Sequence, residues 1–274
     1  MTIKSGTMTL NKNKGVSFLT YNRLSEIDFI NHAFSTRLGG VSKGIFESMN
    51  LSFEHGDFSD VTENYKRMCD ACGFEFESLV ASSQDHHTFV RVCTKENCGV
   101  GIYKPKDIKS VDALVTNEKG VTLVTYYADC TPLFFVDTKK KAIGLAHAGW
   151  RGTVGKIGAE VIKTMTLNYG TDPDDLICAI GPAISKCCYE VDKMCADNFY
   201  SLGLDDSRFV FPREDGKFMV DLLECNRQIL VEAGVKAENI TVSDLCTKCN
   251  SELLWSHRAT NGKRGTMSAF MSLK

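Results

Sequence analysis

The sequence has little proline, no long apolar run and no excess of either charge. Its 274 residues include 5 prolines, and no Pro-rich, Gly/Ser-rich or charged linker divides them. Apolar stretches such as residues 133–136 are far too short to span a bilayer. Lysine and arginine total 32 against 34 acidic residues, so we expect no broad attraction to nucleic acid or to an anionic membrane.

The N-terminus also lacks the apolar segment of a secretory signal peptide, because residues 1–10 alternate between polar and apolar types. We therefore predict a cytoplasmic protein with a single domain over residues 1–274, of which residues 1–14 form a flexible N-terminus. The sequence leaves the choice between monomer and homodimer open.

What the chain does contain is 12 cysteines. In a small secreted protein they would suggest a disulfide framework, but this chain is long enough to bury a core without one. Most of these thiols are therefore expected to be free, buried filler. We expect the same of the Cys-x-x-Cys pair Cys246 and Cys249, which has no second pair, and of the adjacent Cys187 and Cys188.

The hydrophobic pattern mixes strands and helices in irregular order. This favours an α+β fold, a single compact domain with mixed β-sheets flanked by helices. Residues 112–147 are typical of a four-stranded meander, residues 62–72 and 154–170 of helices that end at glycines, and residues 253–257 of a strand.

One cysteine and one histidine stand where neighbouring strands would bring them together. Cys130 lies between two predicted strands, and His147 ends the next one. Such a pair can act as nucleophile and base, or as two ligands of a zinc ion for which Gln84-Asp85-His86-His87 supplies a third. A buried thiol beside a core histidine is the structural alternative.

Four further residues are candidates for catalysis or substrate binding. Arg151, in Gly149-Trp150-Arg151-Gly152, precedes a predicted helix whose free N–H groups would suit phosphate, and Arg37 is a second anion-binding candidate. Asp129 could act as a general acid or base, and Asn50 could bind substrate. Each has a structural alternative, as an ion pair, a strand cap or a brace for a loop.

Several motifs together resemble the laccase-domain family of purine nucleoside phosphorylases, earlier described as multicopper polyphenol oxidases. They follow one another in the family's order along nearly the whole chain, as residues 32–42, Gln84-Asp85-His86, residues 128–132, residues 147–152, residues 180–184 and residues 256–258. The resemblance implies a catalytic metal site made by His86, Cys130 and His147. The family usually has glycine where this chain has His87, which we expect to lie at the surface or beside the ligands, because neighbouring strand residues face opposite ways.

The resemblance further implies a cysteine-hydrolase-like fold and zinc-dependent phosphorolysis of adenosine, inosine and methylthioadenosine, together with deamination of adenosine. Purine nucleosides and phosphate would be the partners, and the enzyme would be both transferase and hydrolase. Copper is the alternative metal. Three alternatives remain: a Cys–His hydrolase or amidase with Cys130 as nucleophile, a copper-dependent phenol oxidase, and a zinc-dependent binding or scaffold protein without catalysis. The 6 histidines contain no paired His-x-His motif, which argues against a multicopper oxidoreductase.

Overall fold

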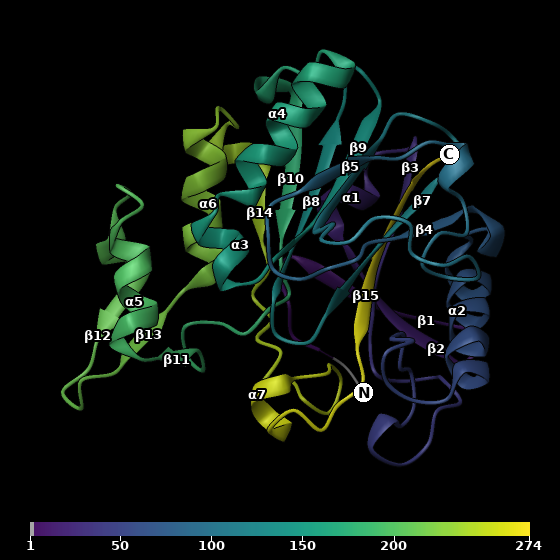
Figure 1. Cartoon of the computed structure of the whole chain (residues 1–274), viewed down its shortest axis with the longest axis horizontal. Coiled ribbons are helices and arrows are strands. Elements are labelled where there is room, and N and C mark those ends of the chain that lie inside the picture. Colours follow the sequence, from purple (N-terminus) through teal and green to yellow (C-terminus); the bar gives the residue numbers. More distant parts are fainter. Residues whose placement is uncertain (1–2) are drawn as a thin grey trace.

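Two six-stranded β-sheets form the centre of the computed structural model, which describes residues 3–274 (Figure 1). The first sheet has the order β1 (Met8–Asn13), β2 (Val16–Tyr21), β3 (Ile30–Ser35), β15 (Met267–Leu273), β7 (Thr122–Tyr127) and β4 (Leu79–Ala81). The second has the order β14 (Ile240–Val242), β10 (Leu176–Ile180), β8 (Thr131–Asp137), β9 (Ala142–Ala148), β6 (Ala113–Thr116) and β5 (Val90–Val92).

The two sheets pack face to face and helices cover their outer faces. Helix α2 (Phe58–Cys72) packs on the first sheet, and α4 (Ile157–Tyr169) and α6 (Leu222–Glu232) pack on the second (Figure 1). The resulting four layers confirm the predicted α+β fold with mixed sheets flanked by helices. No helix within residues 3–274 is long and apolar enough to cross a membrane.

The alternation of side chains along β9 shows how the layers are specified. Ile143 and Leu145 face the first sheet, whereas Ala142 and Ala146 face α4 and α6. By the same alternation His147 points into the space between the sheets, at the end of a row of apolar side chains. The period of the strand therefore places this candidate ligand.

A smaller unit projects from the second sheet. It contains β11 (Glu190–Val191), β13 (Phe218–Val220) and β12 (Val210–Pro212), which pair in that order, and α5 (Lys193–Tyr200) (Figure 1). Phe199, Phe209 and Val220 form its core together with apolar residues of α6. Three short helical segments complete the fold, α1 (Asn22–Ser25), α3 (Trp150–Val154) and α7 (His257–Thr260).

The structure corrects five expectations. Residues 112–147 are no meander, because β7 joins the first sheet between β15 and β4, and apolar alternation does not tell which sheet a strand joins. The predicted helix 154–170 is divided at Lys156, whose φ is +55°, and α2 begins earlier than expected, after the N-cap Asp57. Residues 253–257 form no strand, because a turn and a bend at residues 253–254 lead into α7 at His257, and residues 8–13 pair with β2 rather than forming part of a flexible N-terminus.

Candidate metal centre

Three side chains from separate parts of the chain meet at one end of the space between the sheets. The ligand atoms of His86, Cys130 and His147 all lie within 4.8 Å of one another, a grouping that could hold a metal ion. His147 belongs to β9, Cys130 immediately precedes β8, and His86 lies in the loop that follows β4. The structure thus brings together the three residues that the sequence singled out as ligands.

Strand register places the cysteine beside the histidine. In the antiparallel pair of β8 and β9, Pro132 lies opposite His147 and Thr131 lies opposite Ala148. Cys130 stands at the point where β8 begins, so its thiol reaches the imidazole of the adjacent strand. The expected adjacency of these two strands is therefore confirmed.

The third residue depends on a loop held against β7. The side chain of Gln84 accepts a hydrogen bond from the Tyr126 N–H at 2.6 Å and donates one to the Tyr126 carbonyl at 2.8 Å. The loop thereby pairs with β7 through a side chain instead of a backbone ladder. His86 follows with φ of +71°, an uncommon left-handed conformation for a residue other than glycine.

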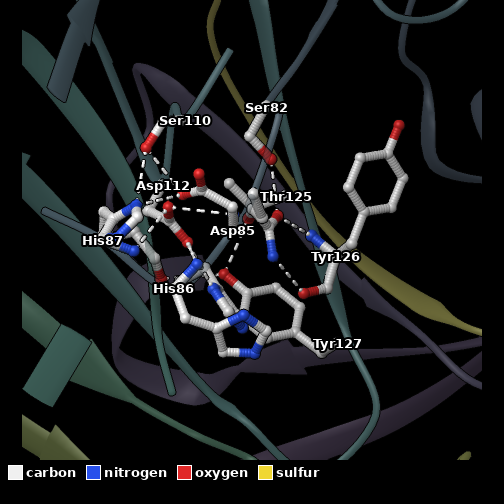
Figure 2. A network of polar contacts seen from close by, with 12 residues as sticks. Ser82, Asp85, His86, His87, Ser110, Asp112, Thr125, Tyr126 and Tyr127 are labelled. Carbon is white, nitrogen blue, oxygen red and sulfur yellow. Dashed lines mark hydrogen bonds and ion pairs between the residues drawn. The ribbon is translucent and has the colours of Figure 1, made fainter. Parts of the chain in front are cut away.

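Asp112, fully buried just before β6, contacts the ring of His147 and the backbone of the loop that carries His86 (Figure 2). Its carboxylate lies 2.8 Å from Nδ1 of His147, which leaves Nε2 of that ring for the thiol or a metal ion. The same carboxylate accepts hydrogen bonds from the successive N–H groups of Asp85, His86 and His87 at 3.0–3.2 Å. Burial raises the pKa of Asp112, but these hydrogen bonds and the charge of His147 outweigh burial and lower it.

The thiol and the imidazole form an ion pair. Burial raises the pKa of Cys130, but the positive charge of His147 and hydrogen bonds from both histidines outweigh it and lower this pKa to about 6. Burial likewise lowers the pKa of His147, and the charges of Cys130 and Asp112 reverse this and raise it to about 9. The cysteine is therefore a thiolate at neutral pH, the form that acts as nucleophile or metal ligand.

Gly149 explains why the motif after His147 needs a residue without a side chain. A Cβ at this position would lie 2.7 Å from Cδ2 of His86 and 3.2 Å from Sγ of Cys130. Such distances are shorter than van der Waals contact, so any larger residue would displace the histidine. The backbone of the Gly-Trp-Arg-Gly turn thus forms one wall around the three donor atoms.

The three residues open into a cavity of about 420 Å³, a size typical of small-molecule sites. Aromatic side chains of Phe53, Tyr126 and Tyr127 line it, as do the charged Lys106 and Arg264. Nη1 of Arg264 donates to Oγ1 of Thr266 at 2.8 Å, whereas its buried Nε has no partner among residues 3–274. The sequence reasoning missed Arg264 and Asp112, since no motif marks the arginine and the role of the aspartate depends on strand pairing.

Asp129 has a structural environment rather than the catalytic one expected. Its carboxylate accepts hydrogen bonds from Oγ1 of Thr247 at 2.6 Å and from the N–H of Arg258 at 2.7 Å. The side chain is 8% exposed, and its backbone has φ of +92°. Asp129 therefore joins three loops behind Cys130 and does not line the cavity found within residues 3–274.

The three predicted substrate-binding residues are also absent from the lining of this cavity. Arg37 donates to the Ser251 carbonyl at 2.8 Å and stacks on Trp255, with 3.9 Å between its guanidinium carbon and the ring centroid. Asn50 is fully buried and braces the loop that carries His55 and the strand start near Thr266. Arg151 is exposed and lies over Trp150.

His87 points away from the cavity (Figure 2). Its Nδ1 lies 2.9 Å from both Oδ1 of Asp85 and Oγ of Ser110, and its side chain is 68% exposed. Of the two adjacent histidines, only His86 belongs to the group that could hold a metal ion.

These observations define a class of protein: a two-sheet α+β protein with a His-Cys-His group at the base of a small-molecule cavity. The chain belongs to the family described as multi-copper polyphenol oxidoreductase laccase, which matches residues 31–274.

Relatives and solved structures agree with this assignment. The chain is 38% identical to the purine nucleoside phosphorylase YlmD of Bacillus subtilis, over 88% of this chain and 87% of that one. It is 35% identical to the purine nucleoside phosphorylase LACC1 of Mus musculus, over 89% of this chain and 55% of that one. The crystal structure of YlmD from Geobacillus stearothermophilus covers 97% of this chain and 98% of its own, with a TM-score of 0.90 and 33% identity.

Proposed function

We propose that this protein is a zinc-dependent purine nucleoside phosphorylase that cleaves adenosine, inosine and methylthioadenosine and also deaminates adenosine. The names of its relatives support nucleoside phosphorolysis. The observation that carries the proposal is one cavity that combines a three-residue ligand group with a guanidinium able to bind an anion. A cytoplasmic location and the choice between monomer and homodimer stay predictions from the sequence.

The donor set suits zinc. One thiolate and two imidazoles are ligands that zinc accepts, and three protein ligands are typical of catalytic zinc because a fourth position remains open. Asp112 fixes the ring of His147 as carboxylates do for many metal-bound histidines, and Gly149 leaves the donor atoms unobstructed. Bound zinc would supply a Lewis acid at the base of the cavity. Copper would bind the same donors.

The chain's own residues would bind the substrates around this base. Phe53, Tyr126 and Tyr127 provide aromatic surface for a purine, and the cavity volume suits a nucleoside. The guanidinium of Arg264, which lines the cavity, would donate to a phosphate oxygen. His147 holds a proton at Nε2 in the metal-free site, with Asp112 stabilising the imidazolium.

The Cys–His hydrolase remains the second candidate, and a specific observation favours it. Cys130, His147 and Asp112 are arranged as nucleophile, base and orienting carboxylate, with the thiol already ionised at neutral pH. This chemistry needs no metal and predicts that Cys130→Ala abolishes hydrolysis of an amide.

Chromatography of adenosine incubated with and without phosphate tests the proposal. Adenine and ribose 1-phosphate formed only with phosphate would support phosphorolysis, and inosine formed in its absence would support deamination. If neither product appears with zinc-loaded protein, the proposed function is wrong. An amidase activity lost on Cys130→Ala would then favour the hydrolase, and oxidation of phenols by copper-loaded protein would favour the oxidase.

Substitution of Arg264 tests the position of the phosphate. We expect Arg264→Ala to raise the KM for phosphate by about 10–100-fold, because a hydrogen bond to a charged group contributes about 1.5–3 kcal/mol. Deamination, which uses no phosphate, should change far less. Arg151→Ala is the matched control. A larger effect of this substitution than of Arg264→Ala would indicate that phosphate binds at the Gly-Trp-Arg-Gly turn instead.

A further inference from the structure

Four cysteines from two distant loops meet at a second place in the molecule. Cys187 and Cys188 lie between β10 and β11, and Cys246 and Cys249 lie between β14 and α7. Their four sulfur atoms all lie within 4.8 Å of one another. The expectation that these residues are unrelated filler is therefore wrong about their placement.

The distances between the sulfur atoms match a tetrahedral metal site. Sγ of Cys187 lies 3.7 Å from those of Cys188 and Cys249, and Sγ of Cys188 lies 3.5 Å from that of Cys249. Four sulfurs at about 2.3 Å from a zinc ion are about 3.8 Å apart along each edge of the tetrahedron. A disulfide would need about 2.05 Å, and all four cysteines are free.

Backbone contacts hold the two loops in this arrangement. Ala183 and Cys246 form a parallel β-bridge, and the Thr247 N–H donates to the Ala183 carbonyl at 3.0 Å. The Ser185 N–H points at Sγ of Cys246 from 3.5 Å, an arrangement that stabilises a thiolate. The sulfurs therefore meet on a braced pair of loops, and not through chance contact of mobile side chains.

We propose that Cys187, Cys188, Cys246 and Cys249 form a second metal centre, a structural zinc site with four thiolate ligands. On binding, the four thiol protons pass to solvent, and zinc with four thiolates carries a net charge of about −2. Lys186 and Lys248, which are sequence neighbours of the ligands, offset part of that charge. Four protein ligands leave no open position, so this centre is structural and its assignment does not depend on the proposed reaction.

This centre would brace the other one. Both of its loops contact Asp129, the residue before Cys130: Thr247 donates to its carboxylate at 2.6 Å, and the Ile184 N–H donates to its carbonyl at 2.9 Å. Asp129 has φ of +92°, which needs support from its surroundings. A metal ion that links the two loops would thus help to hold Cys130 in place.

Metal analysis of protein purified without added metal tests the assignment. We expect about two zinc ions per chain in the wild type, about one in Cys187→Ser/Cys249→Ser, and about one in Cys130→Ser. Cys195→Ser removes a half-buried free thiol outside both groups and should keep both ions. One zinc ion in the wild type that disappears with Cys130→Ser would overturn the proposal, and so would iron in place of zinc at the four cysteines.

Alkylation of the unmutated protein tests the same site without relying on a variant that folds. Cys187 and Cys249 are the two exposed cysteines of residues 3–274, so without a metal both should be accessible to iodoacetamide. We expect both to be protected in zinc-loaded protein and to react after chelation, as read by peptide mass mapping. Rapid alkylation of both in zinc-loaded protein, or a disulfide that joins Cys187 or Cys188 to Cys249, would overturn the proposal.

Discussion

The two cysteine-containing groups of this molecule differ in donors, surroundings and access. His86, Cys130 and His147 combine one sulfur with two imidazoles at the base of a cavity. The group of four cysteines contains sulfur alone, two of its members are exposed, and backbone contacts between loops surround it.

This difference separates a site suited to chemistry from one suited to support. Three ligands beside a cavity leave a position for substrate, whereas four ligands complete the tetrahedron. The buried carboxylate of Asp112 also orients the imidazole of His147, and such a contact raises the basicity of a metal ligand or a general base. Asp129 connects the two groups, because it precedes Cys130 and accepts hydrogen bonds from both cysteine-bearing loops.

The largest expected effect separates the two groups by activity. Cys130→Ser should reduce kcat/KM for nucleosides by more than about 100-fold, because even changes outside the ligand shell cost about 10–100-fold. Cys187→Ser/Cys249→Ser should instead lower the thermal midpoint while it retains most activity below that midpoint. Steady-state kinetics and thermal unfolding of both variants check the contrast, which fails if both lose activity equally at low temperature.

The orienting carboxylate gives the next effect. Asp112→Asn should weaken metal binding in the cavity or activity by about 10–100-fold, because the amide cannot stabilise the His147 imidazolium or fix its tautomer as a carboxylate does. Asp85→Asn is the matched control, because Asp85 lies in the loop that carries His86 and its side chain contacts His87 and Ser110. Equal losses in the two variants, measured by metal titration and kinetics, would refute the special role of Asp112.

The pH dependence of metal binding should also differ between the groups. In the cavity Cys130 is already ionised above about pH 6, whereas His147 keeps its proton up to about pH 9. Between about pH 7 and about pH 8.5 metal binding must release that proton, so affinity should rise about tenfold per pH unit. At the four cysteines, burial and neighbouring thiols raise the pKa of Cys188 to about 11 and that of Cys187 further, so more protons leave and the rise should be steeper.

Competition with a chromophoric chelator at several pH values measures how steeply the metal affinity of each group rises with pH. Cys130→Ser isolates the group of four cysteines, and Cys187→Ser/Cys249→Ser isolates the cavity. A cavity slope near zero over this range would show that His147 is neutral in the metal-free site. Identical slopes would remove the proposed distinction between the groups.

The sequence predicted the parts of the site that depend on strand order and motif. Cys130 stands where β8 begins and His147 lies near the end of β9, so their approach follows from the antiparallel pairing of these strands. Asp112 was not singled out, because only the pairing of β6 with β9 shows that its carboxylate faces His147. The four cysteines could not be recognised, because about sixty residues separate the two pairs and adjacent cysteines have no ligand spacing of their own.

The sequence also did not predict which sheet β7 joins. The apolar alternation of β7 resembles that of its sequence neighbours, yet the strand pairs with β15 and β4 in the other sheet. A period of two fixes which side chains share a face, but it does not fix the partner strand. Arg37 and Asn50 lie outside the cavity lining and brace backbone instead, because a polar side chain in a loop contacts backbone as readily as it binds substrate.

The smallest expected effect distinguishes the two adjacent histidines. His87→Ala should leave metal content and kcat/KM within about twofold of the wild type, because this ring contacts only exposed polar groups and surface changes usually cost under about 0.5 kcal/mol. His86→Ala removes a donor atom and should release the cavity metal. Metal analysis and kinetics of the two variants provide the check. A loss in His87→Ala as large as that in His86→Ala would mean that the loop exchanges one histidine for the other, which its three hydrogen bonds to Asp112 should prevent.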